Sequence, residues 1–122
     1  MVVDELDKLV EAYEGCNTVA FADLSTRMVL VTNSMSTMPR EAIDRVCVQA
    51  AVTLGGDGKT PVGETPATLA LVADKSSVHL FLRATDEPND VLCCVCSTNV
   101  DVEGLMAQAK ECLSRISTND AG

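Results

Sequence analysis

The sequence predicts a single α+β domain whose sheet is covered by helices on both faces. Three observations support this prediction. The chain has 122 residues, which is enough to bury one core and is typical of one domain. Several short runs rich in β-branched residues are apolar on both faces, as in a sheet that is buried on both sides. Three other segments carry apolar residues at helical spacing, so helices are available to cover that sheet.

The chain begins with an expected helix over residues 2–13, for which Gly15 is a plausible stop. A hairpin follows, with strands expected at residues 17–23 and 28–33. Strict alternation would separate the side chains of the second strand between its two faces. It places Met28, Leu30 and Thr32 on one face and Val29, Val31 and Asn33 on the other.

The middle helix, expected over residues 40–54 after Pro39, has two apolar faces. Val48 and Val52 form a second ridge well away from the first face, and Ala51 bridges toward them. Because a helix that covers a sheet needs one apolar stripe, the second ridge predicts a contact with another chain. The first stripe has the spacing of a face that packs on a sheet, and it consists of Ile43, Val46, Cys47, Ala50 and Leu54.

Residues 67–96 are predicted to form three strands joined by two tight turns, and they organise the predicted sheet. The strands are expected at residues 67–73, 78–83 and 91–96, with Asp, Ser and Pro in the turns. The last of these strands is apolar at every position, as expected of a strand buried on both faces. In the strand before it, alternation separates Val78, Leu80 and Leu82 from His79, Phe81 and Arg83.

A final helix is expected after residues 98–101, where the spacing of Thr98 and Asp101 resembles a capping box. Its apolar face extends over four turns to Ile116. Residues 118–122 are polar and are expected to form a flexible tail. The predicted domain therefore spans residues 1–117.

Composition and charge exclude several classes of function. The chain has 9 Lys and Arg residues against 18 Asp and Glu residues, a formal net charge of −9, which argues against nucleic acid and anionic membrane surfaces as partners. No apolar run approaches the roughly 18 residues of a membrane span. The first residues also lack the features of a signal peptide. We therefore expect a cytoplasmic protein with no membrane span.

No pattern predicts nucleotide binding or catalysis. Gly58, Lys59 and Thr60 resemble the end of a phosphate-binding loop, but the first glycine of that motif would fall at position 53, which is Thr53. The segment also follows a predicted helix, whereas the motif follows a strand. His79 is the single histidine and is expected to be structural or half-exposed.

The six cysteines lie among apolar residues in the sequence and are expected to pack as small hydrophobic residues. Alternation places Cys94 and Cys96 on one face of a strand and Cys93 on the other. A strand does not bring together the four ligands that structural zinc requires. The sequence therefore predicts neither a metal site nor a cofactor, and it predicts reduced cysteines.

The predicted order of elements is helix, two strands, helix, three strands, helix. This order, the chain length and the hairpin at residues 19–31 (VAFADLSTRMVLV) resemble the Roadblock/LC7 family. The resemblance implies a three-layer domain with a five-stranded antiparallel sheet, the middle helix on one face and the two terminal helices on the other. Profilin-like, longin-type, PAS and GAF folds are alternatives. One departure is the first hairpin turn, where Ser25, Thr26 and Arg27 stand in place of a glycine common in the family.

The same resemblance implies a dimer joined through the middle helix and the strand that follows the Gly/Pro-rich loop. Members of the family act as platforms in dynein light chains and in lysosomal scaffolds for Ras-like GTPases, and as bacterial partners or activators of such GTPases. The resemblance assigns no catalytic residue, because activation is thought to reposition residues of the GTPase. The expected interface residues are Asp44, Val48, Ala51, Val52, Thr68 and Ala70.

Our main hypothesis from the sequence is a non-enzymatic, dimeric interaction module that scaffolds or regulates a small Ras-like GTPase. The alternative is a ligand- or redox-sensing domain that uses the cysteines or a pocket on the sheet. A third hypothesis is an enzyme that uses His79 and a nearby thiol.

Overall fold

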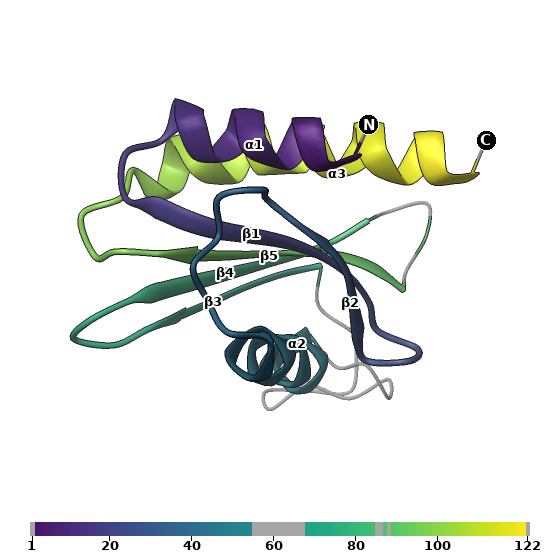
Figure 1. The fold of residues 1–122 in the computed structure, drawn as a ribbon, viewed down its shortest axis with the longest axis horizontal. Coiled ribbons are helices and arrows are strands. Elements are labelled where there is room, and N and C mark those ends of the chain that lie inside the picture. The colour runs from purple at the N-terminus through teal and green to yellow at the C-terminus, as the bar shows by residue number, and fades with distance from the viewer. Residues whose placement is uncertain (1, 55–67, 85–86, 88, 122) are drawn as a thin grey trace.

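The computed structural model describes residues 2–54, 68–84, 87 and 89–121, with the backbone alone for residues 118–121 (Figure 1). Gly58, Lys59 and Thr60, which were considered above as part of a phosphate loop, lie outside the described residues. The elements follow in the order α1 (Val2–Ala12), β1 (Cys16–Asp23), β2 (Met28–Thr32), α2 (Arg40–Leu54), β3 (Leu69–Ala73), β4 (Val78–Arg83), β5 (Asp90–Cys96) and α3 (Val102–Ala121).

The strands form one five-stranded antiparallel sheet in the order β2-β1-β5-β4-β3. Helices α1 and α3 lie side by side on one face, and α2 lies on the other (Figure 1). This arrangement confirms the predicted fold class, element order and three layers. Strands β2 and β3 are the two edges of the sheet, so each of them presents one row of backbone groups to its surroundings.

The core is divided by the sheet into two layers. Val78, Leu80 and Leu82 pack toward α1 and α3, whereas Phe81 packs toward α2. The predicted alternation in β4 is therefore confirmed. The same holds in β5, where Cys94 and Cys96 face the terminal helices and Cys93 faces α2.

The alternation predicted for β2 is wrong, because the strand contains a β-bulge. Val29 pairs with Ala22, and Val31 pairs with the adjacent Phe21, so Leu30 is the extra residue. The bulge moves Val29 and Val31 to opposite faces, since Val29 packs toward α2 and Val31 toward the terminal helices.

The hairpin turn between β1 and β2 contains no glycine, and another residue adopts the left-handed backbone conformation. Arg27 adopts a left-handed backbone conformation, with φ of 56°. Glycine adopts this conformation at little cost, whereas other residues do so rarely. Arg27 therefore fills the backbone role of a turn glycine.

One expectation for the last helix differs from the structure. Asp101 is itself the N-cap of α3, because its Oδ1 accepts a hydrogen bond from the backbone N–H of Gly104 at 3.2 Å, so the predicted capping box from Thr98 is wrong. The helix extends to Ala121. Ser117 anchors this end, since its hydroxyl donates to Asp90 Oδ2 at 2.9 Å.

Candidate interaction surface

Helix α2 packs one face on the sheet and turns another away from it. The helix begins directly after Pro39, whose carbonyl accepts hydrogen bonds from the N–H groups of Ala42 and Ile43. The predicted inner stripe is confirmed as buried against the sheet, and it consists of Ile43, Val46, Cys47, Ala50 and Leu54. Anchored in this way, α2 holds its outward face at a fixed place above the sheet.

The outward ridge of α2 is exposed in the single chain. Val48 is 49% exposed and Val52 is 61% exposed, as the sequence predicted. Ala51 differs, because it is only 3% exposed and belongs to the layer between α2 and the sheet. Ala51 therefore supports the ridge from below and does not form part of the exposed patch.

Strand β3 forms an edge of the sheet, with β4 as its one neighbour among the described strands. The N–H of Arg83 donates to the carbonyl of Thr68, and the N–H of Asp74 donates to the carbonyl of Ser77. Because hydrogen bonding alternates along an antiparallel pair, the backbone groups of Leu69 and Leu71 point away from β4. Both leucine side chains are also exposed, so this edge offers backbone partners and apolar surface together.

The six residues expected at an interface do not form a single patch. Thr68 and Ala70 lie at β3, and Val48 and Val52 lie on the outward ridge of α2. Asp44 lies one turn before Val48, on the side of α2 toward β2. It forms an ion pair with Arg40 at 3.1 Å, and the same guanidinium donates from Nη2 to the carbonyl of Val29 at 3.3 Å.

The flank of α2 that faces β4 carries polar residues that the sequence analysis did not select. The Oε1 atom of Gln49 lies 2.7 Å from Nδ1 of His79, and a hollow of about 350 Å³ lies beside them. Helical spacing could have indicated Gln49, since it lies four residues before Thr53 on one side of the buried stripe. The hollow is lined by Met38, Ala42, Arg45, Val46, Gln49 and His79.

His79 has the contacts of a structural residue. Its second ring nitrogen, Nε2, lies 3.5 Å from the hydroxyl of Ser77, and its ring meets that of Phe81 edge to face. Its ring nitrogens thus face an amide and a hydroxyl. This geometry links α2 to β4 and supports no nucleophile of the kind that the third sequence hypothesis required.

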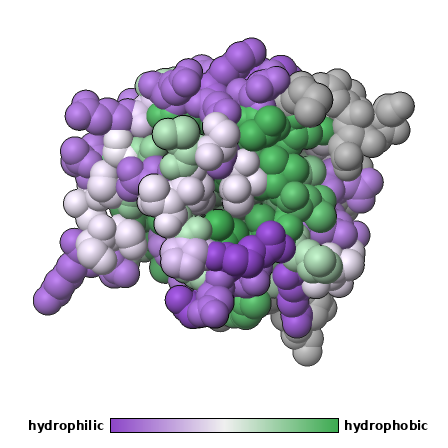
Figure 2. All heavy atoms as spheres, viewed as in Figure 1, coloured by the Kyte–Doolittle hydropathy of each residue, from purple (hydrophilic) through white to green (hydrophobic). Residues whose placement is uncertain are grey.

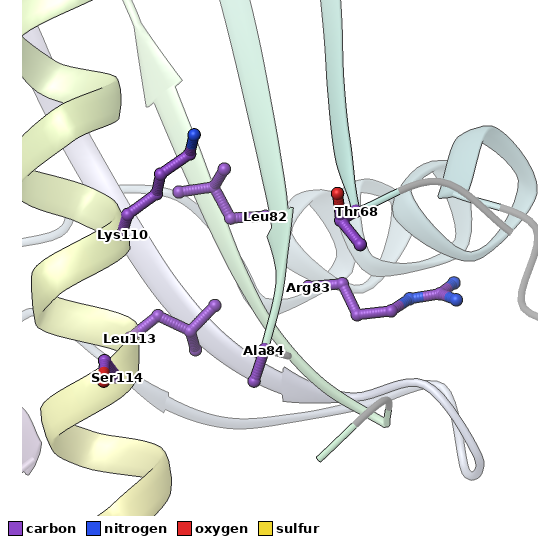
Figure 3. A pocket seen from close by; sticks show the side chains of 7 residues that line it. All are labelled: Thr68, Leu82, Arg83, Ala84, Lys110, Leu113 and Ser114. Atoms are coloured by element: carbon purple, nitrogen blue, oxygen red, sulfur yellow. The ribbon is translucent and has the colours of Figure 1, made fainter. Parts of the chain in front are cut away.

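A second hollow, of about 320 Å³, lies between α3 and the end of β4 (Figure 3). Lys110 and Leu113 line it from the helix, and Leu82 lines it from the strand. Arg83 lines one end but points away from Lys110 (Figure 3). Its Nη2 donates to the last carbonyl of α2, that of Leu54, at 2.9 Å, so this strand residue caps the helix on the other face.

A second apolar patch lies at the opposite edge of the sheet from β3. Met28 and Leu30 of β2 are exposed, and Figure 2 shows hydrophobic residues gathered over and beside this strand. The bulge at Leu30 interrupts the row of outward backbone groups in β2. Of the two edges, β3 is therefore the regular one that another strand can pair with.

All six cysteines are buried as free thiols. Burial raises the pKa of the Cys112 thiol to about 11, and burial likewise raises the pKa of Cys47 and of Cys93. Within the described part of the chain, no three His, Cys, Asp or Glu side chains converge in a way that could hold a metal ion. No described helix is both long enough and apolar enough to cross a membrane.

By sequence, the chain matches no protein-family model and no curated protein. Its fold does match solved structures. A Roadblock/LC7 domain from Streptomyces avermitilis gives a TM-score of 0.74 at 12% identity, over 97% of this chain and 96% of that one. Myxococcus xanthus MglB gives 0.72 at 11% identity, over 97% and 95% of the two chains. MglC from Myxococcus xanthus gives 0.67 at 9% identity, over 98% and 99%.

The chain therefore has the Roadblock/LC7 fold, which the resemblance in the sequence predicted. The similarity extends over nearly the whole length of each of these chains. At these levels of identity it establishes the architecture, and any function must be argued from the surfaces described above.

Proposed function

We propose that this chain is a non-enzymatic interaction module of the cytoplasm that forms a homodimer through α2 and β3 and scaffolds or regulates a small Ras-like GTPase. The observation that carries the proposal is the combination of the exposed ridge Val48–Val52 on α2 with the open, apolar edge at Leu69 and Leu71 of β3. Among the described residues, neither feature is covered by another part of the chain. Both lie on the two elements through which the family resemblance implies dimerisation.

A two-fold axis beside β3 would satisfy both features. The edge of one chain would pair with the same edge of its copy, so the outward backbone groups of Leu69 and Leu71 would find partners. The two α2 helices would then lie on the same face of the joined sheet. A stable interface of this kind should bury at least about 1,200 Å² in total.

This geometry revises the expected set of interface residues. Val48, Val52, Thr68 and Ala70 remain in the proposal. Gln49 joins them, because its flank of α2 is the one turned toward β4 and β3. Asp44, on the flank toward β2, and Ala51, buried beneath the ridge, are assigned no direct contact.

The GTPase part of the proposal rests on the fold and on the family resemblance. Solved structures with this fold include MglB from two bacteria, one of them described as a gliding protein of Thermus thermophilus. Family resemblance associates such modules with small GTPases. The net charge of −9 adds that a partner with a basic contact surface would be favoured.

The dimer is tested by light scattering coupled to size exclusion on the parent protein and a Val52→Glu variant. We expect a dimeric parent and a monomeric variant, because the substitution places an unpaired carboxylate at the centre of the contact. Leu30→Glu is the matched control, since Leu30 is 52% exposed on the other sheet edge, and it should remain dimeric. A monomeric parent at micromolar concentration would overturn the dimer.

The partner is tested separately. Tagged protein is used to capture ligands from the native cell, and the parent and Val52→Glu samples are compared by mass spectrometry. The proposal requires enrichment of a small GTPase by the parent protein. Recovery of other proteins without any GTPase would contradict this part while leaving the dimer intact.

A further inference from the structure

Cys16 and Cys96 lie directly opposite each other on adjacent strands. Cys16 is the first residue of β1 and Cys96 the last of β5, and the two are register partners. Next to them, the N–H of Ser97 donates to the carbonyl of Gly15 at 2.8 Å. That bond makes the cysteines a non-hydrogen-bonded pair, in which the Cα atoms of antiparallel strands are roughly 4.5 Å apart. Disulfides accept Cα separations of about 4.4 to 6.8 Å.

The two side chains also point to the same side of the sheet. Both belong to the core layer beneath α1 and α3. Contact with the Cys96 thiol lowers the pKa of Cys16 in spite of its burial. The same contact, followed by burial, raises the pKa of Cys96. The two thiols therefore form a coupled pair, in which one sulfur can carry the negative charge while the other holds the proton.

We propose that Cys16 and Cys96 form a reversible cross-strand disulfide when the protein meets a hydroperoxide, so that this end of the sheet is a redox-sensitive site. The inference goes beyond the proposed interaction function and does not depend on it. It concerns a property of the single chain.

The chemistry takes place in two balanced steps. The Cys16 thiolate attacks one oxygen of hydrogen peroxide, the O–O bond breaks, and the departing hydroxide takes up a proton to leave as water, giving a sulfenic acid. The Cys96 sulfur then attacks the Cys16 sulfur, the S–O bond breaks, and a second water carries away the Cys96 proton. Two thiols are oxidised and one peroxide is reduced to two waters. A dithiol reverses the change by thiol–disulfide exchange.

Cys16 is the attacking residue because it is the more accessible of the two, with 5% of the residue exposed against 1% for Cys96. It also lies at the end of its strand, directly after Gly15. Opening of a strand end requires fewer broken contacts than opening of the strand centre, where Cys94 lies.

The disulfide would join the start of β1 to the end of β5. Cys16 follows the turn from α1, and Cys96 precedes the turn to α3. Closing a loop of this length restricts the unfolded chain, so the oxidised protein should melt at a higher temperature than the reduced protein. The oxidised state would also lock together the two strand ends from which the chain continues to α1 and α3.

The test treats the intact protein with a slight molar excess of hydrogen peroxide. Free thiols are then counted, and tryptic peptides are analysed by mass spectrometry. We expect two of the six thiols to be lost and then recovered with dithiothreitol. A disulfide should join the peptides 9–27 and 84–110, and fragmentation should place it at Cys96 and not at Cys93 or Cys94.

Three variants test which cysteine is attacked first and which cysteine completes the disulfide. Cys96→Ser should remove the cross-link and leave Cys16 as a sulfenic acid that dimedone can trap. Cys16→Ser should remove both the cross-link and the trapped adduct. Cys94→Ala, which changes the same face of the same strand, should still form the cross-link. In the parent protein, six unchanged thiols, or a disulfide that involves Cys93, Cys94 or Cys112, would overturn the proposal.

Discussion

The hydroxyl of Tyr13 donates a hydrogen bond to the carbonyl of Gly104 at 2.8 Å, joining the segment after α1 to the first turn of α3. The two residues are 91 positions apart in the chain. A side chain at position 104 would crowd this contact, because a Cβ atom there would lie 3.1 Å from Cε1 of Tyr13 and 2.5 Å from Oδ2 of the cap Asp101. Gly104 is therefore suited to the place where the two terminal helices meet.

Removing that hydroxyl should destabilise the fold measurably. We expect Tyr13→Phe to lower the free energy of unfolding by about 1 kcal/mol, since the ring is kept and one partly buried hydrogen bond is lost. Urea unfolding followed by circular dichroism measures the change. Glu11→Gln, on the exposed surface of α1, is the control and should have little effect. Equal stability of the parent and Tyr13→Phe would show that the contact contributes nothing.

The buried thiols should make the free energy of unfolding decrease at alkaline pH. Burial raises the pKa of Cys112 from an ordinary value of about 9 to about 11. The unfolded chain thus releases a proton that the folded chain keeps. The stabilisation is complete below about pH 9 and is lost as the pH rises toward 11.

Comparison of Cys112→Ala with the parent isolates this effect. Between pH 8 and pH 10.5, the parent should lose about 2 kcal/mol more of its unfolding free energy than the variant, at roughly 1.4 kcal/mol per pKa unit. Urea titrations at the two pH values provide the measurement. Parallel losses in the two proteins would mean that Cys112 does not carry the dependence.

The register of β3 predicts opposite effects of proline at neighbouring positions. The N–H of Leu71 points away from β4, so Leu71→Pro should leave the single chain folded but abolish the proposed pairing of β3 edges. The N–H of Ala70 is directed at Phe81, so Ala70→Pro should break the ladder and destabilise the fold. Circular dichroism reports folding and light scattering reports mass. A Leu71→Pro protein that is still dimeric would exclude edge pairing.

The chain by itself should not bind GTP or ATP. Thr53 stands where a phosphate-binding loop has its first glycine. Calorimetric titration of the purified protein with each nucleotide should show no saturable heat. Binding that is weakened by Lys59→Ala would reverse this expectation and identify the loop as a nucleotide site.

The fold was predictable because its signals are periodic. The alternation in β4, as at Leu80 and Phe81, recurs over the whole strand. The inner stripe of α2 likewise recurs from Ile43 to Leu54. One irregular position therefore does not change the prediction of either element. The bulge at Leu30 could not be predicted from the sequence, because it depends on the pairing register between β2 and β1 and not on the composition of β2. Asn33 is a similar case. It was expected at the end of a strand, yet it is buried and accepts the N–H of Val19 at 2.9 Å.

The candidate surface was predictable only in part, for a related reason. Helical spacing is enough to separate Val48 and Val52 from the inner stripe. It does not give the tilt of α2 on the sheet, which decides that Ala51 is covered and that Asp44 turns toward β2. The pair Cys16 and Cys96 could not be foreseen either, because the register between the first and last strands is a tertiary property.

The two sheet edges are unequal, and this inequality limits the size of any assembly built on strand pairing. The bulge at Leu30 interrupts the row of outward backbone groups along β2. The guanidinium of Arg40 also donates a hydrogen bond to the carbonyl of Val29. Once two chains join at β3, the outer margins of the combined sheet are both β2 edges, which offer poor templates for further strands. The same fold that favours a pair therefore opposes a fibre, because growth has no second regular edge from which to continue.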